Sequence, residues 1–144
     1  MVIDDLKLTG ALKISLNDEI VHQCDNLVVT AGKNWVAGRF KDSGIPDEMS
    51  HMAIGSADTA PAAGNTTLAT ELNRIALTTD GGTVSTNTVQ YDASWTSAAA
   101  AYAIKEAGIF NASSGGTMLA RTTFAVINKG TDDTVSISWT ITVS

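Results

Sequence analysis

The sequence has few charged residues, one cysteine and two prolines among its 144 residues. Lys, Arg, Asp and Glu make up 17% of the chain, whereas about a quarter is usual in globular domains. The nine basic residues are scattered without a run, and the net charge is −6. Binding to nucleic acid depends on clustered Lys and Arg that neutralise phosphates. The sequence therefore argues against DNA, RNA or an anionic membrane surface as a partner.

Residues that carry catalysis or bind metals are also sparse. His22 and Cys24 would share one face of a strand, but no second pair of ligands accompanies them. Neither a Gly-x-Ser-x-Gly elbow nor a phosphate-binding glycine loop occurs. Four acidic pairs lack the spacing of a calcium-binding loop, namely Asp4-Asp5, Asp18-Glu19, Asp47-Glu48 and Asp132-Asp133. We therefore expect no enzyme, and no catalytic, cofactor-binding or metal-binding residue.

We expect no targeting segment. Residues 1–5 lack the basic and apolar regions of a signal peptide, and no apolar stretch is long enough to span a bilayer. We therefore expect a protein that is made in the cytoplasm and has no membrane partner.

Hydroxyl residues replace the missing charge, since 31 of the 144 residues are Ser or Thr. Threonine suits the pleated, half-exposed surface of a β-sheet, and 44% hydrophobic residues suffice for a buried core. A chain of this length buries roughly 70% of its unfolded surface without needing disulfides. We expect one β domain over residues 1–144.

Alternation of apolar and polar residues predicts most of the strands. The last strand has the clearest pattern, because a one-residue slip would expose all of its apolar residues. These are Val135, Ile137, Trp139, Ile141 and Val143, which alternate with Ser136, Ser138, Thr140 and Thr142. Residues 1–29 are expected to be extended, and further strands are expected at 51–55, 74–78, 84–95, 102–110 and 118–126.

One short helix is expected around residues 31–41, with Thr30 as its N-cap and with Gly44 and Pro46 beyond its end. Trp35, Val36 and Phe40 would cover the sheet; the alternative for Trp35 is a ligand-binding role. A single helical turn is expected at 67–72. Short strands joined by glycine-rich turns, such as 80–82 and 111–116, favour an antiparallel β-sandwich of jelly-roll or Greek-key type.

Four segments in order carry a resemblance to a known class of protein. They are Asn26–Ala37, His51–Leu72 with its Met52-Ala53-Ile54-Gly55 core, Glu106–Arg121, and Asn128 to the closing strand. Together they resemble small structural proteins of tailed-bacteriophage particles, of the head-decoration (cement) or tail-fibre-associated type. The similarity covers most of residues 26–143. Within it, Arg121 is a lone charge on a strand and is expected to pair with Glu106 across a hairpin.

This resemblance implies a virion protein that binds the outer surface of the capsid and stabilises contacts between capsomers. Its expected partners are the major capsid protein and copies of itself in a homotrimer, with residues 1–20 as an arm that reaches a neighbour. The neutral hydroxyl faces would then be contact area, although an ordinary solvent face is an equal alternative. A tail, baseplate or tail-fibre component is the second interpretation. A carbohydrate-binding module is the third, with Trp35, Trp95 or Tyr102 stacking on sugars.

Overall fold

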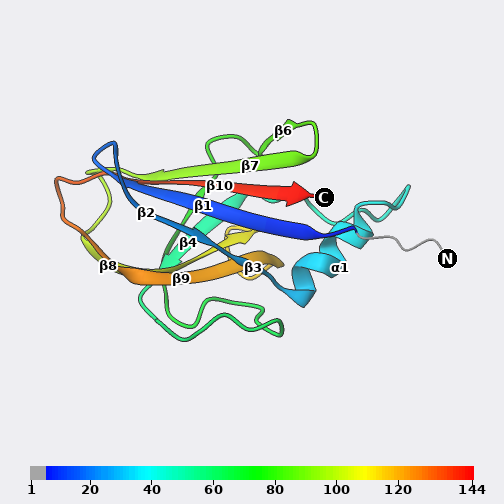
Figure 1. Ribbon diagram of the computed structural model, residues 1–144, viewed down its shortest axis with the longest axis horizontal. Coiled ribbons are helices and arrows are strands. Elements are labelled where there is room, and N and C mark those ends of the chain that lie inside the picture. Colours follow the sequence, from blue (N-terminus) through cyan, green and yellow to red (C-terminus); the bar gives the residue numbers. More distant parts are fainter. Residues whose placement is uncertain (1–5) are drawn as a thin grey trace.

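The computed structural model describes residues 6–144 and contains two antiparallel sheets packed face to face (Figure 1). Sheet A has the strand order β2-β1-β10-β7-β6, and sheet B has the order β3-β9-β8-β4-β5. The expected antiparallel β-sandwich with one short helix is therefore confirmed. The elements are β1 (Leu8–Leu16), β2 (Glu19–Asp25), β3 (Leu27–Val28), α1 (Thr30–Gly38), β4 (His51–Gly55), β5 (Glu71–Ala76), β6 (Thr83–Ser85), β7 (Thr88–Trp95), β8 (Tyr102–Phe110), β9 (Met118–Lys129) and β10 (Val135–Val143).

Strand β10 lies at the centre of sheet A and fixes its register. Ile137 lies opposite Ile14 of β1 and Ala93 of β7, and all three side chains are buried. The alternation predicted for β10 is confirmed except at Val143, which is 39% exposed because it lies at the open end of the strand. The hydroxyl residues between the apolar ones face outward, away from sheet B.

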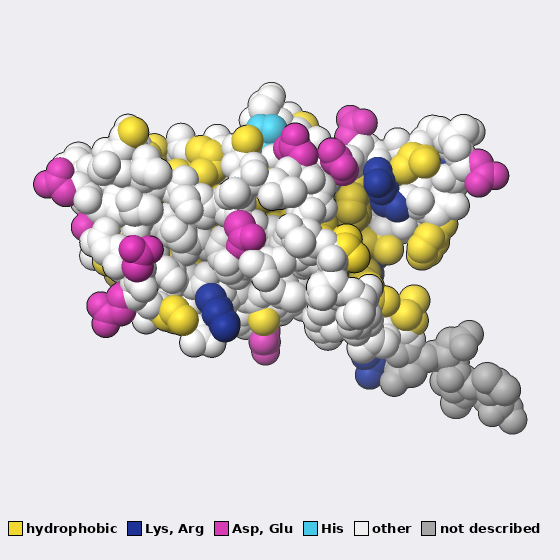
Figure 2. Space-filling view, turned by 90° about the horizontal axis from the view of Figure 1, so that it is seen from above, with side chains coloured by type: hydrophobic (Ala, Val, Ile, Leu, Met, Phe, Trp, Pro, Cys, Tyr) yellow, Lys and Arg dark blue, Asp and Glu magenta, His cyan; other side chains and the backbone are white. Residues whose placement is uncertain are grey.

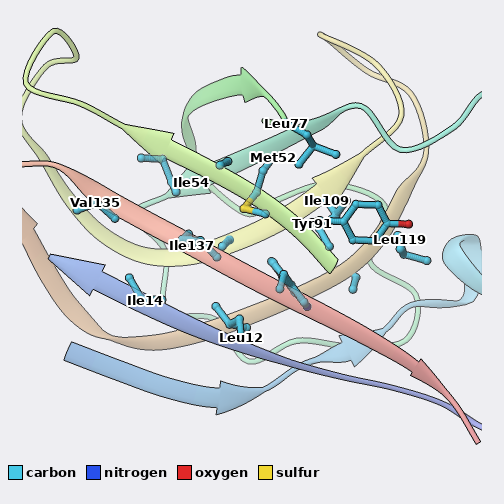
Figure 3. Close-up of a cluster of buried hydrophobic side chains, with 14 of the residues drawn as sticks. Leu12, Ile14, Met52, Ile54, Leu77, Tyr91, Ile109, Leu119, Val135 and Ile137 are labelled. Carbon is cyan, nitrogen blue, oxygen red and sulfur yellow. The ribbon is translucent and has the colours of Figure 1, made fainter. Parts of the chain in front are cut away.

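The core between the two sheets contains both tryptophans expected there, Trp95 and Trp139 (Figure 3 shows other members of this core). Each buried indole N–H donates to an asparagine Oδ1, from Trp95 to Asn73 at 2.9 Å and from Trp139 to Asn26 at 2.7 Å. Burial raises the pKa of Tyr91 to about 12, so that its phenol stays neutral in the core.

The predicted turns are confirmed where glycine is required. Gly81 and Gly82 follow the loop after β5, and Gly115 and Gly116 join β8 to β9; all four have positive φ. Such a backbone conformation costs least at a residue without a Cβ atom. Strand β9 extends three residues beyond the predicted 118–126, to Lys129.

Helix α1 differs from its predicted form at both ends. Its N-cap is Val29 rather than Thr30, and it ends at Gly38 rather than at residue 41. Trp35 and Val36 pack against the core as expected. Phe40, however, is 81% exposed, because the helix stops before this residue can reach the face that contacts the sheet.

Two further expectations are wrong. The helical turn at 67–72 is absent, because residues 56–70 form an irregular loop and Glu71 already pairs with Gly55 as the start of β5. The arm expected at 1–20 is wrong for β1, which pairs along its whole length with β10 inside sheet A. Residues 1–5 of that arm lie outside the described residues.

We predict that the buried face of β10 carries much more stability than its outer face. Ile137→Ala should lower the free energy of unfolding by about 2–5 kcal/mol, because it removes a fully enclosed side chain. Thr142→Ala on the opposite face should change it by less than about 1 kcal/mol. Urea unfolding measures both values, and equal losses would contradict this assignment of faces.

Candidate functional site

The two outer faces of the sandwich differ because the chain covers only one of them. On sheet B, the loop of residues 56–70 lies over the outer side, where Leu68 packs against a second apolar cluster. The fully buried members of this cluster from sheet B are Ala53, Phe110 and Met118. Sheet A carries no such cover among residues 6–144.

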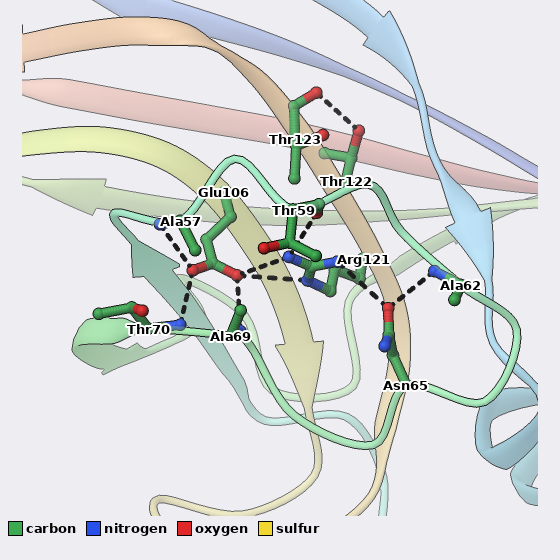
Figure 4. A network of polar contacts seen from close by, with 10 residues as sticks. All are labelled: Ala57, Thr59, Ala62, Asn65, Ala69, Thr70, Glu106, Arg121, Thr122 and Thr123. Atoms are coloured by element: carbon green, nitrogen blue, oxygen red, sulfur yellow. Dashed lines mark hydrogen bonds and ion pairs between the residues drawn. The ribbon is translucent and has the colours of Figure 1, made fainter.

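A buried ion pair holds this loop to sheet B (Figure 4). Arg121 on β9 donates to Glu106 on β8, with Nη2 and Oε1 separated by 3.1 Å, and the two side chains are 1% and 0% exposed. The carboxylate also accepts hydrogen bonds from three loop amides, at 3.0 Å from Ala57, 2.9 Å from Ala69 and 2.8 Å from Thr70. Both ends of the loop are therefore bonded to one carboxylate.

The guanidinium of Arg121 binds the middle of the same loop. Its Nη2 donates to the carbonyl of Thr59 at 3.0 Å, and its Nη1 donates to Oδ1 of Asn65 at 3.1 Å. The Asn65 oxygen also accepts from the amide of Ala62 at 2.8 Å. The predicted pairing of Arg121 with Glu106 is thus confirmed, and its contacts are those of a structural anchor for the loop.

Glycine at position 55 allows this close approach. A Cβ atom there would lie 2.4 Å from the carbonyl oxygen of Thr70 and 2.6 Å from Cγ of Glu106. Any other residue would therefore push the loop away from the carboxylate that anchors it.

The outer face of sheet A is uncovered and nearly neutral. Register pairing places the outward residues of β1, β10 and β7 in rows, such as Thr9 beside Thr142 and Thr142 beside Thr88. Among the outward residues of these three strands only Lys13 and Asp92 are charged, and Asp92 accepts a hydrogen bond from Ser138. The neighbouring strand β2 adds Asp25, which lies opposite Ala11. Figure 2 views the molecule from the edge that β6 and β7 form, and there it shows charged groups scattered across mostly uncharged surface.

The candidate metal ligands His22 and Cys24 lie on the edge strand β2. The His22 ring contacts Phe124, with ring centroids 5.5 Å apart, and the Cys24 sulfur lies 3.7 Å from Oγ1 of Thr122. Burial raises the pKa of the Cys24 thiol, which lowers its nucleophilic fraction. Within residues 6–144, no group of three or more His, Cys, Asp or Glu side chains could hold a metal ion.

The remaining candidates have structural contacts. Trp35 donates from Nε1 to the carbonyl of Asp47 at 2.7 Å, which ties α1 to the segment that follows it. Trp95 is buried and Tyr102 is partly buried against the core, so they do not form an aromatic platform with Trp35. Of the acidic pairs, Asp133 accepts from Asn17 and from the amide of Gly130 in a turn, and Asp4-Asp5 lies outside the described residues.

The sequence did not predict the loop groups that bind the ion pair, and it did not predict that a lysine would be buried. Lys129 is 2% exposed and donates to the carbonyls of Ala99, Ala100 and Gly130, at distances from 3.0 to 3.4 Å. Backbone acceptors carry no residue signature, so no pattern in the sequence could have indicated these contacts.

Comparison of the chain with family models, curated proteins and solved structures finds no match. Among the described residues, no helix has the length and apolar character needed to cross a membrane. The proposed function therefore depends on the sequence patterns and on the faces and contacts described above.

We predict that Glu106 and Arg121 are strongly coupled. Glu106→Gln should lower the free energy of unfolding by about 3–5 kcal/mol, because it leaves a buried guanidinium without its counter-charge. Adding Arg121→Met should cost at least about 1 kcal/mol less than the sum of the two single changes, because no unpaired charge then remains.

The control is a second ion pair that joins β8 to the same loop. Lys105 lies 3.9 Å from Asp58, but the Lys105 side chain is partly exposed and that of Asp58 is 81% exposed. Lys105→Gln should therefore cost less than about 1 kcal/mol. Additive losses at Glu106 and Arg121 in urea unfolding would show that the pair does not act as a unit.

Proposed function

We propose that this protein is a structural component of a tailed-bacteriophage particle, a decoration protein that binds the outside of the capsid and stabilises contacts between capsomers. One observation supports this proposal most directly, the uncovered and nearly neutral outer face of sheet A. The resemblance of residues 26–143 to virion proteins supplies the biological setting. The partner of this face would be the major capsid protein.

A neutral hydroxyl face suits burial against another protein for a physical reason. Unpaired charges are expensive to bury, whereas Ser and Thr side chains can exchange bonds to water for bonds to a partner. On this face the hydroxyls of Ser94 and Ser136 already bond to each other at 2.9 Å. Few desolvated charges would therefore oppose association.

The size of the face also suits an interface. Strands β1 and β10 have nine residues each, about 30 Å at the usual rise per residue. Five strands spaced about 4.8 Å apart add roughly 20 Å in width. Because β2 has seven residues and β6 three, the area is at most roughly 600 Å², which is at the lower end of what each partner contributes to a specific interface. Added buried area of this kind stabilises an assembled shell by mass action.

We predict that purified particles of the source phage contain this protein in numbers comparable to the major capsid protein. Quantitative mass spectrometry of the particles measures the ratio. A few copies per particle would contradict a decoration role and would place the protein in the tail, and absence from particles would contradict a virion role.

The face itself is tested by adding charge at its centre. Thr140→Lys places an ammonium in the middle of sheet A and should lower binding to particles that lack the protein by at least about tenfold. Ser114→Lys, on the exposed β8–β9 turn, adds the same charge elsewhere and should bind normally. Equal binding by both variants in co-sedimentation would show that sheet A is not the contact face.

A further inference from the structure

Strand β2 forms one edge of sheet A, and its outer side pairs with no other strand of the described chain (Figure 1). The backbone of an edge strand offers N–H and C=O groups on which a further strand can add. Proteins usually protect such an edge with lysine, with proline or with a bulge. Strand β2 contains no Lys, Arg or Pro, and its pairing with β1 shows one register shift, beside Ile14. Most of this edge is therefore open to another strand.

The hydrogen bonds around β2 show which of its backbone groups point outward. The amide of Asn26 donates to the carbonyl of Gly10 on β1 at 3.1 Å, and backbone direction alternates along an antiparallel ladder, so Cys24 also faces β1. Gln23 and Asp25 therefore face away from β1, and the Asp25 carbonyl accepts from a hydroxyl of β9. Among the described residues, no hydrogen bond to the outward N–H or C=O of Gln23 is present.

The side chains on this side of the sandwich suit contact with another protein chain. Ile20, Val21 and, on the neighbouring β9, Val126 are between 44% and 51% exposed. Val21 and Val126 line one shallow hollow, and adjacent exposed apolar side chains are typical of binding surfaces. The acidic residues of β2 lie at its two ends, Glu19 and Asp25. An incoming strand therefore meets no charge at the centre of β2.

We propose that β2 pairs antiparallel with β2 of a second copy about a two-fold axis at Gln23, so that sheet A continues through both copies. The Gln23 N–H and C=O then bond to those of Gln23 in the second copy, and Asp25 lies opposite Val21. Charge selects this register, because an axis at His22 would place Glu19 opposite Asp25, and like charges directly opposite each other are unfavourable. This inference does not depend on the proposed role in a phage particle.

The symmetry of this contact fixes the number of copies. A two-fold contact uses the same edge on both chains, so it closes with two copies and leaves no β2 edge for a third. The resemblance to virion proteins implies three copies instead. The molar mass of the assembled protein therefore distinguishes the two.

The first test measures the molar mass of the full chain by light scattering over a concentration series. Wild type should approach twice the mass of one chain. Gln23→Pro removes the outward N–H but no bond to β1, and it should weaken association by at least about tenfold. Gln23→Ala is the matched control, because it removes the same side chain but keeps the N–H, and it should associate as wild type does.

Three outcomes would overturn the proposal. They are a wild-type chain that stays monomeric up to its solubility limit, a mass of three chains, and equal association of the Gln23→Pro and Gln23→Ala chains. Matching circular dichroism spectra and urea midpoints would show that both variants remain folded.

A disulfide trap tests the register and does not require that proline is tolerated. In a Cys24→Ser chain, Gln23→Cys places two thiols opposite each other across the axis, with Cα atoms about 5.5 Å apart, a separation that a disulfide spans. This chain should form a covalent dimer on oxidation. Gln90→Cys in the same background is the control, because Gln90 is also exposed on sheet A but lies on β7. No dimer through position 23, or equal yields at both positions, would overturn the proposal.

Discussion

The buried ion pair between Glu106 and Arg121 determines which face of this sandwich is open. Removing two charges from water is costly, and the cost is offset only when every polar atom finds a partner. Here the partners are the loop itself, through the amides of Ala57, Ala69 and Thr70 and the side chain of Asn65. The pair and the loop therefore depend on each other. With the loop in place, Leu68 closes the apolar cluster on sheet B, and sheet A remains the uncovered face.

This asymmetry connects the composition of the chain with its proposed role. The hydroxyl residues that replace charge lie in rows on sheet A, centred on β10, while the charges of Glu106 and Arg121 are buried on the other side. An exposed apolar groove near Phe40 lies at the end of the sandwich. The protein thus presents a broad polar face on sheet A and a small apolar groove at one end of the sandwich.

The alternation of apolar and polar residues along the chain predicted the strands that have one buried face. The alternation in β10 and β7 follows from one buried face, and the ion pair follows from Arg121 as the single charge within residues 118–126. The same alternation could not predict which strands pair. It shows that residues 8–16 form a strand but not that β10 lies beside it. The loop over sheet B was mistaken in part for a helical turn, because its bonds to Glu106 use backbone amides. Phe40 was misplaced because its helical spacing from Val36 does not show where α1 ends.

Amide hydrogen exchange in the unmodified protein tests the central claim most directly. The amides of Ala57, Ala69 and Thr70 lie at the two ends of an irregular loop but donate to a buried carboxylate, so they should exchange only when the structure opens. Their protection should approach that of the β8–β9 ladder. Exchange as fast as that of an exposed loop residue such as Gly64 would contradict the claim that the ion pair anchors the loop and so decides which face is open.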